Sequence, residues 1–161
     1  MKLGVISDSH DNLPMIRKAV HYFTDEDRVD AVVHAGDFVA PFSVRELAKL
    51  TVPIYGVFGN NDGERAGISK VLPQIQEPPL HLELGGRKLI VTHDIASVNE
   101  SERDAADVVI FGHTHNKLVE HRDGKLLLNP GELGGWLTGK CTIAVIDLKT
   151  LDVELLYLWE G

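Results

Sequence analysis

The chain has 161 residues, with 16 lysines and arginines against 24 aspartates and glutamates, and a formal net charge of −8 at pH 7. This excess of acidic residues argues against a protein that binds nucleic acid through a basic surface. The sequence contains no apolar run long enough to span a bilayer. Residues 1–6 go straight into strand-like sequence without a signal-peptide layout, so we expect a cytoplasmic protein without membrane contact.

The first half of the chain alternates between apolar strands and amphipathic helices. Strands are predicted over residues 3–7, 31–35 and 53–58, and helices over about 13–23, 42–50 and 64–72. This alternation indicates a parallel sheet with right-handed crossovers. In such a sheet the loops after the carboxyl ends of the strands lie along one edge, where ligands bind.

The second half is typical of hairpins. Antiparallel pairs are predicted over residues 80–84 with 88–92, 118–122 with 125–128, and 141–147 with 153–159. Between the first two pairs we expect a helix over about 98–106 and a buried strand over 108–111. The predicted fold class is therefore α/β, a two-sheet β-sandwich flanked by helices in the layer order α/β/β/α. We expect a single domain over residues 1–161, and the sequence is compatible with a homo-oligomer.

Polar side chains follow the ends of the predicted strands, where the loops should converge. They are Asp8, His10, Asp37, Asn60, His93, His113 and His115. All are oxygen or nitrogen donors, a set that suits Mn²⁺, Fe²⁺, Co²⁺, Ni²⁺ or Zn²⁺ better than a soft metal, Mg²⁺ or Ca²⁺. Seven donors are too many for one ion, so we expect two ions. Asp37 is the candidate bridge, because Gly36 beside it lets the backbone come close.

The histidine pair at the end of the strand over 108–111 leaves three interpretations open. Gly112 allows a sharp turn there, and His113 and His115 would point to opposite faces if the strand continued. They could serve one metal together only if the chain leaves strand geometry. In a loop each could instead hold one of two adjacent ions, or both could simply be exposed.

The motifs together resemble those of a known family. Asp8-x-His10, Gly36-Asp37, Gly59-Asn60, His93 and Gly112-His113-Thr114-His115 occur in the order of the calcineurin-like metallophosphoesterases. The sequence is most similar to their small single-domain phosphodiesterase branch, over essentially its whole length. The resemblance implies one ion held by Asp8, His10, Asp37 and His115, and a second held by Asp37, Asn60, His93 and His113. It implies two divalent ions per chain, with Mn²⁺ or Ni²⁺ preferred over Fe²⁺, Co²⁺ or Zn²⁺.

The activity implied by this resemblance is that of a divalent-metal-dependent phosphodiesterase. It would hydrolyse a small phosphodiester or nucleotide-like substrate through a dinuclear site and a metal-bound hydroxide. We expect Asp37, Asn60 and His93 to act in catalysis. The alternative is a protein-binding scaffold with little or no catalysis, because the branch also resembles the scaffold subunit of the eukaryotic retromer.

Three positions depart from the family pattern. Many members have a histidine where this chain has Asn61, and an amide cannot donate a catalytic proton by titrating. Asp94 replaces a usual glycine, and either accepts a hydrogen bond from a ligand imidazole or faces solvent. Glu132 replaces a more usual serine, and we expect it to repel a dianionic phosphate.

The remaining histidines and one tryptophan have other interpretations. We expect His34 to be a packed core residue, and His21, His81 and His121 to lie on the surface. Trp136, in a glycine-rich segment, is a candidate for stacking on a nucleotide base, although packing or an oligomer contact is the commoner role of such a residue.

Overall fold

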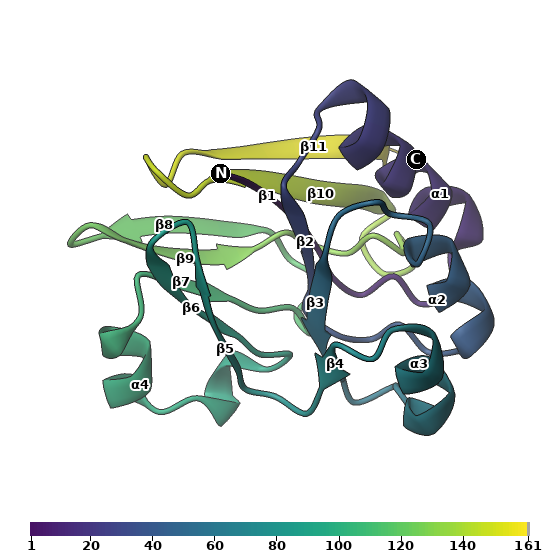
Figure 1. Ribbon diagram of the computed structural model, residues 1–161, viewed down its shortest axis with the longest axis horizontal. Helices are drawn as coiled ribbons and strands as arrows, with labels where there is room; N and C mark the ends of the chain where they lie inside the picture. Colours follow the sequence, from purple (N-terminus) through teal and green to yellow (C-terminus); the bar gives the residue numbers. More distant parts are fainter. Residues whose placement is uncertain (161) are drawn as a thin grey trace.

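Two β-sheets lie face to face in the centre of the molecule, with helices on their outer faces (Figure 1). The computed structural model describes residues 1–160. Strand order is β11-β10-β1-β2-β3-β4 in the first sheet and β5-β6-β7-β9-β8 in the second. This arrangement confirms the predicted α/β class and its layer order.

The first sheet contains the predicted parallel core. Its strands are β1 (Lys2–Ile6), β2 (Ala31–His34), β3 (Ile54–Val57), β4 (Ile75–Gln76), β10 (Lys140–Asp147) and β11 (Val153–Glu160). Strands β1 to β4 pair in parallel, and the β10-β11 hairpin joins them through an antiparallel pairing of β10 with β1. The sequence did not predict β4, because two residues are too few to show a period of two.

Three helices connect these strands and cover the outer face of the first sheet (Figure 1). They are α1 (Leu13–His21), α2 (Pro41–Leu47) and α3 (Arg65–Val71). The Asn12 side chain caps α1, and the helix ends two residues earlier than predicted. A π-helical turn, η1 (Tyr22–Glu26), follows and keeps Phe23 buried.

The second sheet is mixed. Its strands are β5 (Leu80–Leu84), β6 (Arg87–Val91), β7 (Val108–Ile110), β8 (Leu118–Arg122) and β9 (Lys125–Asn129). Both predicted hairpins, β5-β6 and β8-β9, are present, and β7 pairs in parallel with β6 and β9. Helix α4 (Glu100–Ala105) starts later than predicted, because Asn99 forms a capping box with Glu102. A 3₁₀ turn, η2 (Ile95–Ser97), precedes it.

Alternating side chains of the strands build separate apolar layers. Leu3 and Val5 of β1 point between the sheets, where they pack with residues of the second sheet such as Leu89 and Val108. Ile6 points the other way, into the layer beneath α1 to α3. Within residues 1–160, no helix combines the length and apolarity that crossing a membrane requires. The strand ends are thus fixed by packing on both sides, which sets the positions of the loops that follow them.

Candidate metal centre

The loops that follow β1, β2, β3, β6 and β7 meet at one edge of the sandwich. Backbone hydrogen bonds tie these loops together: Asp8 N–H donates to the carbonyl of Gly36 at 2.9 Å, and His10 N–H to that of Asp37 at 3.1 Å. The N–H of Gly112 donates to the carbonyl of His93 at 3.0 Å. All seven side chains predicted from the strand ends lie here, in two groups on either side of the Asp37 carboxylate.

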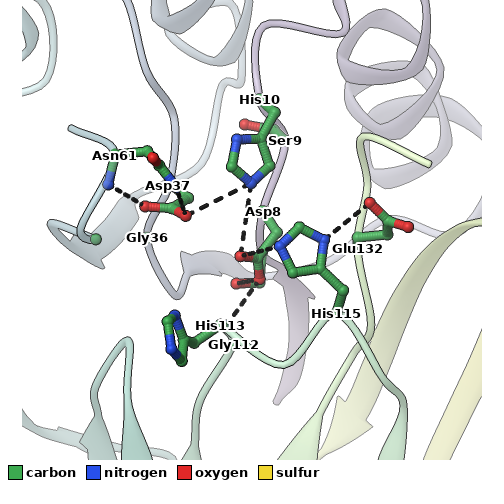
Figure 2. Close-up of polar contacts among 12 residues, drawn as sticks. Asp8, Ser9, His10, Gly36, Asp37, Asn61, Gly112, His113, His115 and Glu132 are labelled. Carbon is green, nitrogen blue, oxygen red and sulfur yellow. Dashed lines mark hydrogen bonds and ion pairs between the residues drawn. The ribbon is translucent and has the colours of Figure 1, made fainter. Parts of the chain in front are cut away.

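The first group is largely buried and contains Asp8, His10 and His115 (Figure 2). His115 Nε2 lies 3.4 Å from Asp8 Oδ1, and His10 Nε2 lies 3.8 Å from the same oxygen. His10 Nε2 is also 3.5 Å from Asp37 Oδ2. The rings of His10 and His115 stack with centroids 5.2 Å apart, and both Nε2 atoms face Asp8 Oδ1.

The second group lies beside Asp37 and is more open to solvent. Asn60 Oδ1 is 2.9 Å from His93 Nε2 and 3.0 Å from His113 Nδ1. His93 Nε2 is 3.4 Å from Asp37 Oδ2, the same oxygen that faces His10. Asp37 therefore stands between the two groups, where the sequence predicted the shared carboxylate.

The donor atoms of the first group fit a cation. Asp8 Oδ1 and His10 Nε2 are buried and have no hydrogen-bond partner among residues 1–160. Leaving such atoms unpaired is costly, and a native structure rarely does so without a functional reason. Burial also raises the pKa of the Asp8 carboxyl, against the hydrogen bond that Ser7 Oγ donates to it. A positive ion between these atoms would satisfy both of them and stabilise the carboxylate charge.

The backbone at this edge adopts a conformation that side chains rarely tolerate. Five of the seven residues have a positive φ: Asp8 (51°), His10 (40°), Asp37 (62°), His113 (65°) and His115 (60°). Such strain clusters at functional sites, where the surrounding structure enforces it. At His113 and His115 the chain has left strand geometry, as two histidines serving a common site require.

Two glycines allow the close packing of these loops. A Cβ at Gly36, whose φ is +100°, would lie 2.7 Å from His93 Nδ1. A Cβ at Gly112 would lie 2.0 Å from Ser7 Oγ. The φ of Gly112 is not positive, so the need for a glycine there comes from its close approach to Ser7 and Asp8. The predicted turn follows at once, with a positive φ at His113 and a hydrogen bond from Thr114 N–H to the Gly112 carbonyl at 2.7 Å.

Asn61 orients Asp37. Its backbone N–H donates to Asp37 Oδ1 at 2.8 Å and its side-chain amide to Oδ2 at 2.7 Å. Burial alone would raise the pKa of Asp37, but His93 and the two N–H groups of Asn61 outweigh it and lower that pKa below its usual value. Asp37 is therefore a permanently ionised carboxylate near neutral pH.

Glu132 corrects an expectation from the sequence. It is fully buried and does not face the open side of the centre. Its carboxylate lies 2.9 Å from His115 Nδ1 and accepts N–H groups of the segment 136–138. Burial alone would raise the pKa of Glu132, but His115 and Thr138 lower it. The residue holds His115 with Nε2 directed at Asp8, and does not stand where it would repel a phosphate.

Asp62 was not singled out from the sequence. It is 3% exposed, and its carboxylate accepts N–H groups of Asp37 (3.0 Å), Val39 (2.7 Å) and Gly59 (2.7 Å). It thereby joins the loop after β2 to the loop after β3. The signal in the sequence is only its position at the end of Gly59-Asn60-Asn61-Asp62.

The other histidines lie as predicted. His34 is fully buried, with its ring between Ser9 Oγ (3.0 Å) and the backbone N–H of Gly36 (3.1 Å). His21, His81 and His121 are exposed. Asp94 is also exposed and caps η2 by accepting the N–H of Ala96, which decides between its two interpretations in favour of solvent.

Known proteins resemble this chain over nearly its whole length. The family model of the calcineurin-like phosphoesterase superfamily domain matches residues 1–151. A phosphodiesterase of Methanocaldococcus jannaschii is 43% identical over an alignment of 166 residues. The alignment covers 98% of this chain and 99% of that protein.

Two solved structures have a similar fold. A structure described as a novel archaeal phosphodiesterase has a TM-score of 0.89 at 37% identity and covers 98% of this chain and all of its own. Vps29 of Entamoeba histolytica, solved with zinc, has a TM-score of 0.71 and covers 98% of each chain. At 19% identity, this second likeness shows the fold alone. The chain therefore belongs to the calcineurin-like phosphoesterase superfamily.

Proposed function

We propose that this protein is a divalent-metal-dependent phosphodiesterase with a dinuclear centre. One observation carries the proposal: two groups of oxygen and nitrogen donors flank Asp37 Oδ2, and the buried Asp8 Oδ1 and His10 Nε2 lack a partner among residues 1–160. The phosphodiesterase of Methanocaldococcus jannaschii, at 43% identity, supports the reaction class.

Each group would hold one ion. Asp8, His10, Asp37 and His115 would hold the first, and Asp37, Asn60, His93 and His113 the second. Imidazole and carboxylate ligands without a thiolate suit Mn²⁺, Fe²⁺, Co²⁺, Ni²⁺ or Zn²⁺, and of these we expect Mn²⁺ or Ni²⁺. When bound, two such ions acidify a water for attack on phosphorus and neutralise charge on the phosphoryl oxygens.

The chain's own residues prepare this chemistry by orientation. Asn61 and His93 hold the Asp37 carboxylate ionised and in one rotamer. The carbonyl of Ala35 lies 2.8 Å from His93 Nδ1 and accepts a hydrogen bond from it, which directs Nε2 toward Asp37 Oδ2 and Asn60 Oδ1, where an ion would be held. Asn61 cannot supply a proton to a departing alkoxide. The favoured substrates are therefore diesters with a good leaving group.

The test is metal-dependent turnover of an activated aryl phosphodiester such as bis(p-nitrophenyl) phosphate. We expect metal-stripped protein to regain hydrolysis on addition of Mn²⁺ or Ni²⁺. Asp37→Ala should abolish this recovery and also remove Mn²⁺ binding measured by calorimetry. His81→Ala, which removes an exposed histidine, should behave as the unaltered protein.

Two results would contradict the proposal. Turnover that Asp37→Ala leaves intact would show that the centre is not the active site. Absence of turnover with every divalent metal, in protein that still binds them, would favour the scaffold alternative.

A further inference from the structure

A short segment beside the centre presents apolar side chains to solvent. Residues 133–139 contain Trp136 and Leu137, which are 65% and 74% exposed, the highest values among the exposed large hydrophobic residues of the described chain. Burying such side chains would be favourable, and their exposure at a functional edge calls for an explanation. A packing role for Trp136 does not fit this exposure.

The backbone of this segment is fixed to the loop that carries the first group. Gly134 N–H donates to the carbonyl of Asp8 at 2.9 Å, and Asn12 Nδ2 donates to the carbonyl of Gly134 at 2.7 Å. The Glu132 carboxylate holds the N–H groups of Trp136 (3.0 Å) and Leu137 (3.0 Å). The exposed side chains therefore stand on a rigid support, and little further ordering would be needed to bind a ligand.

The indole of Trp136 is itself held in place. Its Nε1–H donates to the backbone carbonyl of His10 at 3.1 Å. A Cβ at Gly134 would lie 2.9 Å from Trp136 Cδ1, so the ring rests close to the glycine backbone. Because the single polar atom of the ring is satisfied by the protein, the surface left to solvent is the apolar aromatic part.

We propose that Trp136 is a binding platform on which a planar ring of the substrate stacks, so that the preferred phosphodiesters carry a nucleobase or a comparable aromatic group. This inference rests on the proposed function. The carbonyl that anchors the indole belongs to His10, whose imidazole is part of the first group, so the platform adjoins the place where the phosphate would react. Stacking on an aromatic side chain tolerates any base, because every base has a flat face.

The test compares two ligands that differ only in the base. Adenosine 5′-monophosphate and ribose 5-phosphate are titrated as competitive inhibitors of aryl phosphodiester hydrolysis by the Mn²⁺-loaded protein. We expect the nucleotide to bind roughly 5- to 100-fold more tightly. Trp136→Ala should bring this ratio to within about twofold of one, with ribose 5-phosphate unaffected. Trp136→Phe loses the bond to His10 but keeps a ring, so it should retain most of the preference.

Fluorescence gives a second readout that does not need turnover. The chain has two tryptophans, so Trp159→Phe leaves Trp136 as the only indole emitter. Trp159→Phe keeps an aromatic ring on β11 opposite Cys141, so its inhibition constants should stay those of the unaltered protein. In that variant, adenosine 5′-monophosphate should quench the emission and ribose 5-phosphate should not.

The outcomes separate the two proposals. If no metal supports hydrolysis but the nucleotide still quenches Trp136, the proposed function fails and the ring site stands. An inhibition ratio that Trp136→Ala leaves unchanged would overturn the platform. So would a change in sedimentation of Trp136→Ala without a change in that ratio, because it would assign the exposed ring to contact with another protein chain.

Discussion

Asn61 binds both carboxylate oxygens of Asp37, one through its backbone N–H at 2.8 Å and the other through its side-chain amide at 2.7 Å. The residue that replaces the family's histidine thus acts on the shared carboxylate. Its amide fixes the rotamer of Asp37. The hydrogen bonds that Asn61 donates also lower the pKa of this carboxyl, which keeps it ionised.

Asn61→Ala should weaken metal binding more than it weakens the fold. The substitution keeps the backbone hydrogen bond but removes the bond to Oδ2, the oxygen that both groups face. Loss of such an orienting contact costs about 10- to 100-fold in metal affinity. Calorimetric titration with Mn²⁺ checks this, with Asn116→Ala as a control, since that exposed amide donates to the Thr114 carbonyl and faces neither group. Equal affinities for the two variants would show that Asp37 needs no such support.

Glu132→Gln should impair both His115 and the segment 136–138. One amide oxygen would remain for the donors that the carboxylate accepts, leaving partly buried N–H groups unpaired. We expect the free energy of unfolding to fall by about 1–3 kcal/mol, and Mn²⁺ affinity to fall roughly 10-fold or more. Urea unfolding and calorimetry measure the two effects. Glu120→Gln, on exposed β8, removes the same charge and should change neither quantity.

Asp62→Asn should loosen the loops that carry Asp37 and Asn60. The variant keeps a single acceptor oxygen where three backbone N–H groups converge. A loss of about 1–3 kcal/mol in unfolding free energy is expected. Amide hydrogen exchange should accelerate at Asp37, Val39 and Gly59, and Asp123→Asn in an exposed turn serves as the comparison. Unchanged exchange at these three amides would disprove the bracing role of Asp62.

His34 should make the metal-free protein sensitive to acid. Burial lowers the pKa of its imidazole from 6.5 to about 3. Between these values the unfolded chain binds a proton that the folded chain does not, so this contribution to stability is complete above pH 6.5 and is lost as the pH falls toward 3. At about pH 5 the loss should reach about 2 kcal/mol.

A neutral substitute provides the control for this prediction. The side-chain amide of His34→Gln can accept the Gly36 N–H and donate to Ser9 Oγ without titrating. The difference in unfolding free energy between pH 7 and about pH 5, measured by urea denaturation, should be smaller in the variant by about that amount. An identical pH dependence for both proteins would mean that another group is responsible.

The predictable parts of this structure are those encoded locally. Apolar runs of four or five residues specified the parallel strands, and the polar residues at their ends then had to converge because parallel strands share an edge. The dipeptides Gly85-Gly86 and Asp123-Gly124 located two hairpins.

Long-range relationships were the part that the sequence could not provide. Nothing in residues 140–147 indicates that β10 pairs with β1 at the far end of the chain. The roles of Asp62 and Glu132 likewise depend on which N–H groups the folded loops bring within reach. Acidic residues in polar loops are commonly solvated, so their burial here had no local signature.

The positive φ values at five of the seven donor residues set a limit on how this protein can be made more robust. Each such backbone costs roughly 1–2 kcal/mol relative to a right-handed one. Glycine would remove that cost at any of the five positions and would delete a donor in the same step. At these five positions a substitution that raises thermal stability would therefore remove a side chain of the candidate metal centre. We expect thermostable variants with an intact centre to carry their changes in the apolar layers and on the outer surface instead.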